Sequence, residues 1–193
     1  MFESISILVG RFDPKVLEST IELAVEIARE GREGRRIGTI FIIGDEENVL
    51  GHSRLLILDP LFGHPDDVKY IDDGNLRGTI KELAQLDGAF VISARGIVLS
   101  ACRYIDTAAA TVELPLGMGS RHLAGASITK ITRAISVVVS ESSMVRVFDG
   151  GTLIAEIIPE LWLLNRRNVH LPTPYNEQDI QDLAVLTRVK KAS

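Results

Sequence analysis

The spacing of apolar residues predicts a helix over residues 14–30. Apolar positions recur there at intervals of three and four residues, which places them on one face of a helix. These positions are Leu17, Ile21, Ala24, Val25 and Ala28. Asp13 followed by Pro14 marks the expected start, because proline at the first helical position needs no partner for a backbone N–H.

Further along the chain, short apolar runs alternate with helical patterns. Residues 37–43 form a short run rich in β-branched residues that ends at Gly44-Asp45, which predicts a strand buried on both faces. Other strands are expected over 89–93, 97–101, 136–140, 144–148 and 152–158, and helices over 76–86 and 124–135. Because these elements interleave without strict βαβ alternation, we predict an α/β fold with a central mixed β-sheet flanked by helices.

The length of 193 residues is a little more than the ~150 of a typical domain, which favours one domain with a peripheral extension. We expect the helix and basic loop of residues 1–36 to be peripheral and residues 37–159 to form the core. Residues 160–193 are expected to form a linker and a short helix, over about 177–190, that packs on the core.

Composition excludes several classes of protein. A chain with 46% hydrophobic and 24% charged residues is not globally disordered. A net charge of −5 argues against binding nucleic acid or a membrane through bulk charge, so an anionic ligand must be held by local donors. The N-terminus lacks a basic leader and the apolar runs are shorter than the ~20 residues that cross a bilayer, so we expect a cytoplasmic location.

The single cysteine, Cys102, has no partner for an internal disulfide, and no Cys/His spacing predicts a structural zinc site. We expect it to be a small buried hydrophobe. The arginines of residues 32–36 predict a solvated loop, with a phosphate or partner contact as the alternative. His52, His64 and His170 lie in polar or Gly/Pro-flanked contexts typical of the surface.

Three polar clusters lie at predicted strand or helix ends, where a site built on a sheet gathers its ligands. They are Asp87-Gly88-Ala89, Gly119-Ser120-Arg121-His122 and Ser140-Glu141. The second cluster leads through glycines into the start of a predicted helix. Its backbone amides, hydroxyl and guanidinium all favour binding of a phosphate. Taken singly, the clusters are also explained as an Asp-Gly turn and an ordinary capped helix.

The chemistry of the three clusters is complementary. A carboxylate can ligate a divalent metal or accept a proton from a hydroxyl, and Arg121 can bind a phosphate through two hydrogen bonds. His122 can donate to the phosphate and Glu141 is a second carboxylate. This combination favours nucleotidyl or phosphoryl transfer. The chain has no Walker A or Gly-x-Gly-x-x-Gly pattern, so neither a P-loop NTPase nor a dinucleotide dehydrogenase is supported.

The same clusters resemble the motifs of a known family. Asp-Gly-Ala-Phe-Val-Ile at 87–92, Gly-Met-Gly-Ser-Arg-His at 117–122 and Val-Val-Ser-Glu at 138–141 resemble, in order and spacing, the motifs of the diadenylate cyclase domain family. That family includes the nucleotide-binding domain of the DNA-integrity scanning protein, and the likeness covers roughly residues 38–159. Its members condense two ATP molecules into cyclic di-AMP and two pyrophosphates, so the resemblance implies this activity, substrate and product.

The resemblance also implies roles for individual residues. Asp87 corresponds to the catalytic carboxylate that engages Mn²⁺ or Mg²⁺ and the ribose 3′-hydroxyl. Ser120, where the family usually has threonine, meets the phosphates together with Arg121 and His122, which we assign as catalytic.

The remaining implied contacts complete the nucleotide site. Gly88 and Ala89 let the nucleotide approach the backbone, and Ser140 and Glu141 close the site from the following strand. The region of Tyr104 and Ile105 corresponds to the one that packs against adenine.

One position departs from the usual pattern of the family. Leu123 stands where many members have a second arginine after the histidine, and this removes one cation from the surroundings of the triphosphate. Another basic side chain, the metal or a partner subunit could replace it. The departure keeps two rival functions open: a nucleotide or cyclic di-AMP sensor with weak turnover, and an ATP-dependent nucleotidyltransferase or ATPase of another class.

The reaction itself requires two nucleotide sites. Each 3′-hydroxyl must attack the α-phosphorus of the other ATP in line with the leaving pyrophosphate. Since one domain holds one site, we expect a face-to-face homodimer, with a higher oligomer also compatible with the sequence. No nucleic-acid or membrane partner is expected.

Overall fold

The computed structural model describes residues 11, 13–31, 34–108, 110–159, 175–180 and 183–188. Its helices are α2 (Pro14–Glu30), α3 (Glu46–Gly51), α4 (Gly74–Leu83), α5 (Ser120–Ile131) and the short 3₁₀-helix η1 (Asp66–Val68). Its strands are β1 (Thr39–Ile43), β2 (Ser53–Leu55), β3 (Ala89–Ile92), β4 (Val98–Ile105), β5 (Ile135–Val139), β6 (Val145–Asp149), β7 (Thr152–Ile157), β8 (Tyr175–Ile180) and β9 (Leu183–Arg188).

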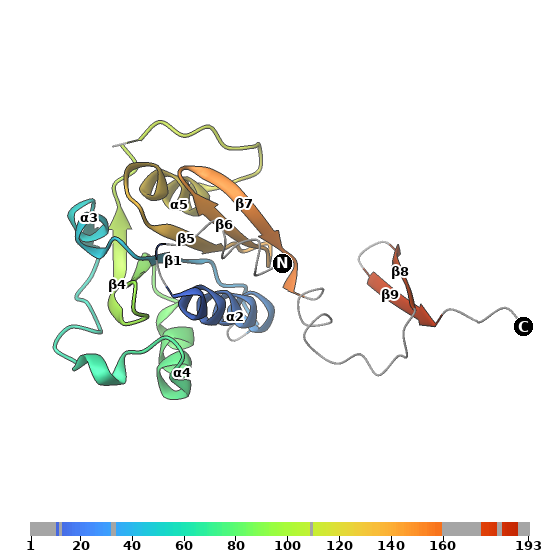
Figure 1. The fold of residues 1–193 in the computed structure, drawn as a ribbon, viewed down its shortest axis with the longest axis horizontal. Helices are drawn as coiled ribbons and strands as arrows, with labels where there is room; N and C mark the ends of the chain where they lie inside the picture. The colour runs from blue at the N-terminus through green and yellow to red at the C-terminus, as the bar shows by residue number, and fades with distance from the viewer. Residues whose placement is uncertain are drawn as a thin grey trace, which may run out of the picture. The chain divides into compact units, whose positions relative to one another are not determined.

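Seven strands form one mixed sheet in the order β2-β4-β3-β1-β5-β6-β7 (Figure 1). Only β1 and β3 run parallel to each other, and the other neighbouring pairs are antiparallel. Helices cover both faces of this sheet, so the predicted α/β fold with a central mixed sheet is confirmed.

The two faces of the sheet pack against different helices. Ile40 and Ile42 of β1 belong to the core cluster that contains Ala126 and Ile128 of α5. Because side chains alternate along a strand, Phe41 faces the opposite layer, where its ring stacks on Phe90 of β3 at 5.2 Å between centroids. Figure 1 shows α2 on this opposite side of the sheet from α5.

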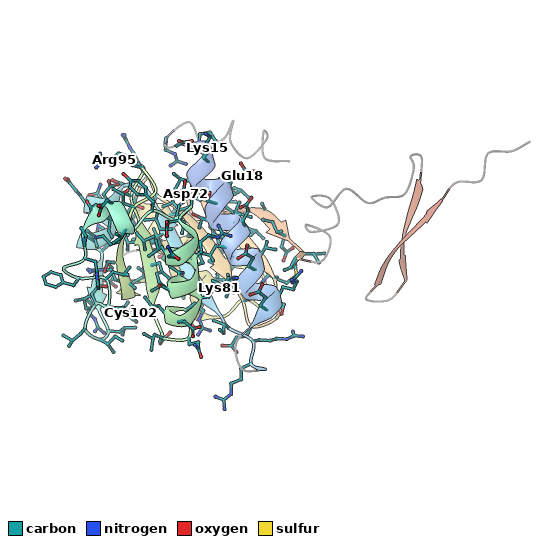
Figure 2. All side chains as sticks on the ribbon, turned by 90° about the horizontal axis from the view of Figure 1, so that it is seen from below. Lys15, Glu18, Asp72, Lys81, Arg95 and Cys102 are labelled. Atoms are coloured by element: carbon teal, nitrogen blue, oxygen red, sulfur yellow. The ribbon has the colours of Figure 1, made fainter. Side chains whose placement is uncertain are left out.

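Helices α2 and α4 lie side by side and are joined by ion pairs (Figure 2). Arg77 of α4 contacts Glu26 of α2 at 2.8 Å, and Lys81 contacts the same carboxylate at 2.9 Å. The aspartate expected to start α2 does so: the side chain of Asp13 accepts a hydrogen bond from the amide of Lys15. Ile21 of α2 is fully buried, as expected for a helix packed by one face.

The pairing of β3 with β4 contains an irregularity beside residue 88. Ala89 pairs with Arg103 but Val91 pairs with Ser100, so β4 has one residue more than β3 between these pairs. Cys102 lies in this bulge with a φ of 55°, and it is buried as expected. Burial, together with the charges of Asp59 and Asp87, raises the pKa of the Cys102 thiol, which therefore stays protonated.

Most predicted elements agree with the structure. The helix over 14–30, the strands either side of the turn at 94–96 and the three final strands of the sheet are confirmed. The short α3 and β2 were not predicted. The predicted helix over about 177–190 is wrong, because β8 and β9 form an antiparallel hairpin joined by residues 181–182. The basic residues Arg188, Lys190 and Lys191 suggested the C-terminal end of a helix, but such residues do not exclude strands.

The chain divides into two compact units, Met1–Pro159 and Glu160–Ser193. The predicted division at residue 37 lies inside the first unit and stays a prediction, as does packing of the last segment on the core. Within the described residues, no helix combines the length and apolar character needed to span a membrane.

Helix α5 lies close to β5 at Gly125. A β-carbon added at Gly125 would lie 2.7 Å from Cγ2 of Val138 and 2.8 Å from Oγ of Ser136. We expect Gly125→Ala to reduce the free energy of unfolding by about 1–2 kcal/mol, because this crowding outweighs the better helix propensity of alanine. Urea denaturation measures the change.

The matched control is Gly78→Ala in α4, where an added β-carbon meets nothing within 4 Å. This second substitution should stabilise the protein by about 0.5–1 kcal/mol. Equal effects of the two substitutions would contradict the close packing of α5.

Candidate active site

The strand order brings four strand ends together at one edge of the sheet. The parallel strands β1 and β3 both begin there, since Ile40 pairs with Ala89. Their antiparallel neighbours end there, because Thr39 pairs with Val139 of β5 and Ala89 pairs with Arg103 of β4. All three predicted clusters lie at this edge, the second of them at the start of α5.

Arg121, in the first turn of α5, links the clusters. Its Nη1 donates a hydrogen bond to Oε1 of Glu141 at 2.9 Å, and its Nη2 lies 3.9 Å from Oδ1 of Asp87. The guanidinium lies against the backbone of Gly38, where an added β-carbon would be 2.9 Å from Nη1. Both carboxylates are mostly exposed, so these contacts position the side chains and add little stability.

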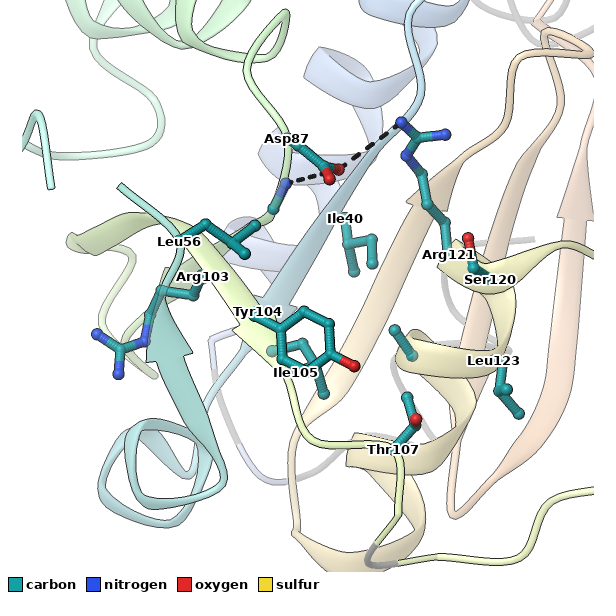
Figure 3. A pocket seen from close by; sticks show the side chains of 12 residues that line it. Ile40, Leu56, Asp87, Arg103, Tyr104, Ile105, Thr107, Ser120, Arg121 and Leu123 are labelled. Atoms are coloured by element: carbon teal, nitrogen blue, oxygen red, sulfur yellow. Dashed lines mark hydrogen bonds and ion pairs between the residues drawn. The ribbon is translucent and has the colours of Figure 1, made fainter. Parts of the chain in front are cut away.

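One cavity, the Asp87 cavity, contains six of the predicted site residues (Figure 3). These are Asp87, Gly88, Tyr104, Ile105, Ser120 and Arg121. Asp87 and Arg121 point toward each other there, and Oδ1 of Asp87 accepts a hydrogen bond from the amide of Gly88 at 3.0 Å. Apolar side chains line another part of its wall: Ile40, Leu56, Leu123 and Ala124. A cavity with one apolar wall and exposed polar groups suits a base and its phosphates.

A second cavity, the His122 cavity, adjoins the first through Ser120 and Arg121. It is lined by Gly117, Gly119, Ser120, Arg121, His122, Ser140, Glu141, Ser142 and Arg146. Helix α5 begins at this cavity without a side-chain cap, because its N-cap residue is Gly119. The His122 amide donates to the carbonyl of Gly119, so the first-turn amides that remain for an anion are those of Ser120 and Arg121.

His122 is buried at the base of the second cavity. Its side chain packs edge-on against Phe148, and its Nε2 accepts a hydrogen bond from Nη1 of Arg146 at 3.0 Å. Because arginine has no acceptor, the proton of the neutral ring is on Nδ1, which has no hydrogen-bond partner within the described part of the chain. Burial and the positive charge of Arg146 lower the pKa of His122, and Arg121 adds to this while Glu156 opposes it.

Three predicted site residues have contacts that are explained by the fold. Ala89 is fully buried in the core cluster and not at a cavity surface. A β-carbon on Gly88, whose φ is 110°, would lie 2.6 Å from the carbonyl carbon of Cys102, so the bulge in β4 requires glycine there. The Ser140 hydroxyl bonds to Ser142 within the turn that follows β5.

Leu123 lies at the first cavity and not at the second. Its neighbours in that wall include Tyr104 and Thr107, and 37% of its surface is exposed. The missing arginine of the motif therefore corresponds to a position beside the apolar wall. The positive charge next to His122 comes instead from Arg146 of β6.

Sequence reasoning missed several residues of this region. Arg146 interrupts an otherwise apolar strand, and a charge at such a position is a signal that could have been used. Arg103 bonds to Ser53 Oγ at 2.7 Å and so joins β4 to the edge of the sheet beside the first cavity. Arg35 and Arg36 line a third cavity with Asp87 and Arg121, so the phosphate alternative for the basic loop remains open.

The donor set at Asp87 fits a divalent cation of the magnesium type. Such ions use one or two carboxylates and complete their coordination with water and substrate phosphates. Asp87 is exposed and Glu141 lies on the other side of the same guanidinium. Among the residues that the structure describes, no three metal-ligating side chains of His, Cys, Asp or Glu gather into a preformed cage.

Comparison with known proteins identifies the relatives of this chain. Residues 26–153 match the sequence model of the DAC family, described as the nucleotide-binding domain of the bacterial checkpoint controller DisA. A diadenylate cyclase of Methanocaldococcus jannaschii is 48% identical over 151 residues, which are 78% of this chain and 48% of that protein. A diadenylate cyclase of Haloferax volcanii is 41% identical over 154 residues, which are 79% of this chain and 56% of that protein. The chain thus spans about half the length of these relatives.

A solved structure supports the fold. The crystal structure described as a hypothetical membrane spanning protein from Bacillus cereus superposes with a TM-score of 0.51 at 19% identity. The match covers 70% of this chain and 61% of that one.

The buried position of His122 leads to a pH dependence. We expect its ring to titrate below the ordinary value of 6.5 in a pH series of NMR spectra. The unfolded chain binds this proton more readily than the folded one. The stabilisation that the neutral His122 ring provides is therefore complete above pH 6.5, and it is lost as the pH falls through the lowered pKa. A ring that titrates above 6.5 would contradict the environment described for His122.

Proposed function

Because the chain belongs to the diadenylate cyclase domain family, we propose that it condenses two molecules of ATP into cyclic di-AMP and two pyrophosphates. The two diadenylate cyclases that it resembles over 78% and 79% of its length support this activity. The geometric support is one observation: Asp87, Arg121 and Glu141 come from three distant segments and meet at one edge of the sheet.

Different residues contact the adenine and the phosphates of the nucleotide. The adenine lies against the wall formed by Ile40, Ile105 and Tyr104, and the phosphates extend toward the start of α5. Arg121 exchanges its contact with Glu141 for a phosphate, with the Ser120 hydroxyl and the helix amides as further donors.

Asp87 acts on the nucleophile. Its carboxylate accepts a hydrogen bond from the ribose 3′-hydroxyl and orients the oxygen toward the α-phosphorus of the second ATP. The amide of Gly88 fixes the orientation of the carboxylate through the 3.0 Å hydrogen bond to Oδ1. The new bond joins the 3′-oxygen to the α-phosphorus, the bond to the bridging oxygen breaks, and pyrophosphate leaves.

A divalent cation, Mn²⁺ or Mg²⁺, would be held by Asp87 and would neutralise the charge that develops on the phosphates. The 3′-hydroxyl must reach a second ATP, and one chain offers one such site. Two chains therefore pair face to face, as a homodimer or within a higher oligomer. We also infer that the protein works in the cytoplasm.

The second candidate is a nucleotide or cyclic di-AMP sensor with the same cavities, favoured by Leu123 in place of an arginine. Such a protein binds ATP or cyclic di-AMP without measurable turnover. Another transferase or ATPase would release ADP or an AMP adduct. Chromatography of the products formed from ATP with Mn²⁺ or Mg²⁺ separates these cases, and we expect cyclic di-AMP and pyrophosphate.

Asp87→Asn should abolish synthesis. We expect the rate of cyclic di-AMP formation to fall by about 10³-fold or more, because the amide cannot accept the hydroxyl proton or hold the cation. The melting temperature should stay close to that of the unchanged protein, since the side chain is 83% exposed. Near-normal turnover of Asp87→Asn would remove the residue from the mechanism.

Leu123→Arg tests the departure from the family pattern. We expect kcat to stay the same or fall, because the new cation would enter the apolar wall beside Ile40 and Tyr104 and not the His122 cavity. Leu116→Arg, at a fully exposed position, controls for the added charge. A clear rise of kcat in Leu123→Arg alone would show that a phosphate contact is missing in this chain.

A further inference from the structure

The His122 cavity has a source of positive charge that the motif does not include. Arg146 stands in the middle of β6, where it pairs with Val138 of β5 and Glu156 of β7. Its side chain is only 15% exposed, yet it lines the cavity beside Gly119, Ser120 and Arg121. The guanidinium is therefore largely shielded from bulk water but still accessible from the cavity.

The contacts of Arg146 fix its guanidinium from two sides. Nε donates to Oε1 of Glu156 at 2.6 Å, and Nη1 donates to Nε2 of His122 at 3.0 Å. A guanidinium carries five N–H donors in a planar fork, so donors remain for a ligand in the cavity.

His122, which lines the same cavity, has an unpartnered polar atom. The residue is 5% exposed, and its Nδ1 is buried with no hydrogen-bond partner among the described residues. A buried polar group without a partner costs free energy, and strain, a catalytic role or a bound water or ion explains such groups in native proteins. The uncapped start of α5 lies at the same place.

We propose that Arg146 supplies, from β6, a second cation of the polyphosphate site beside Arg121. This inference rests on the proposed function, in so far as the ligand is ATP. Arg146 binds the β- and γ-phosphates beside Arg121, and its bond to Nε2 holds the neutral His122 ring with its proton on Nδ1. The second cation thus comes from the sheet, whereas Arg121 comes from the helix.

Binding measurements test the proposal without requiring turnover. Isothermal titration should show ATP binding to Arg146→Met about tenfold or more weaker than to the unchanged protein, the loss expected for a charge-assisted hydrogen bond. AMP, which lacks the β- and γ-phosphates, should bind equally to both. Arg146→Lys should be intermediate, because it keeps the charge and loses the fork.

Two controls separate phosphate binding from a structural role. Glu156→Gln breaks the same ion pair but keeps the cation, so ATP should bind at least as tightly as to the unchanged protein. Arg95→Met removes an arginine at the other end of the β3–β4 hairpin and should change nothing. If Arg146 only tied β6 to β7, Glu156→Gln would weaken ATP binding as much as Arg146→Met does.

The His122 ring gives a second readout. In ¹⁵N spectra the His122 ring of the unchanged protein should show a single tautomer with unprotonated Nε2. In Arg146→Met the ring should lose this tautomer preference and titrate at higher pH. The charges that face the ring are those of Arg146 on β6, Glu156 on β7 and Arg121 on α5. Should Arg146→Met fail to fold, Arg146→Lys and Glu156→Gln still decide the question.

The outcomes distinguish this inference from the proposed function. ATP affinity within twofold of normal in folded Arg146→Met overturns the role of Arg146, even if the protein makes cyclic di-AMP. Selective loss of ATP binding supports it, even if the protein makes none. A protein that does not bind ATP at all overturns both.

Discussion

The parallel pairing of β1 with β3, inside a sheet that is otherwise antiparallel, determines where the chemistry lies. Strands β1 and β3 start at the same edge of the sheet, and their neighbours β5 and β4 end there. Four connecting segments therefore meet at this edge. Gly38, Asp87, the end of β4 and Glu141 lie in these segments, and α5 starts beside them. If β1 and β3 were antiparallel, Asp87 would lie at the opposite edge from Arg121. The pairing is held by continuous burial of both strands, which leaves their short polar ends as the accessible parts.

The charges at this edge are arranged in pairs that can be rearranged. Arg121 contacts Glu141 and approaches Asp87, while Arg146 contacts Glu156. The more exposed pair of Arg121 with Glu141 contributes about 0–1 kcal/mol to stability, so exchanging this carboxylate for a phosphate would cost little. The carboxylates hold the two arginines in place and offset their charge, and this limits the repulsion that unpaired arginines would suffer.

Local sequence patterns were sufficient for the longer helices, for most strands of the mixed sheet and for the polar clusters, because helical spacing, apolar runs and Gly-rich turns are local signals. The start of α2 at Asp13 and the position of Arg121 in the first turn of α5 follow directly from them. The strand order and the contact of Arg146 with His122 could not be predicted, since they depend on pairings between residues far apart in the chain. The pairing of β8 with β9 was missed because the signal used, basic residues at the expected end of a helix, does not exclude strands.

The close approach of α5 to β5 at Gly125 affects more than packing. Gly125 lies one helical turn after Arg121 on the same side of α5, so any displacement at the glycine is carried as a rigid-body movement to the guanidinium. Loss of activity on substitution there would report a misplaced arginine and not a lost substrate contact. A mutational scan of this enzyme family has to distinguish such mechanical positions from chemical ones, and stability measured alongside activity at each site provides the distinction.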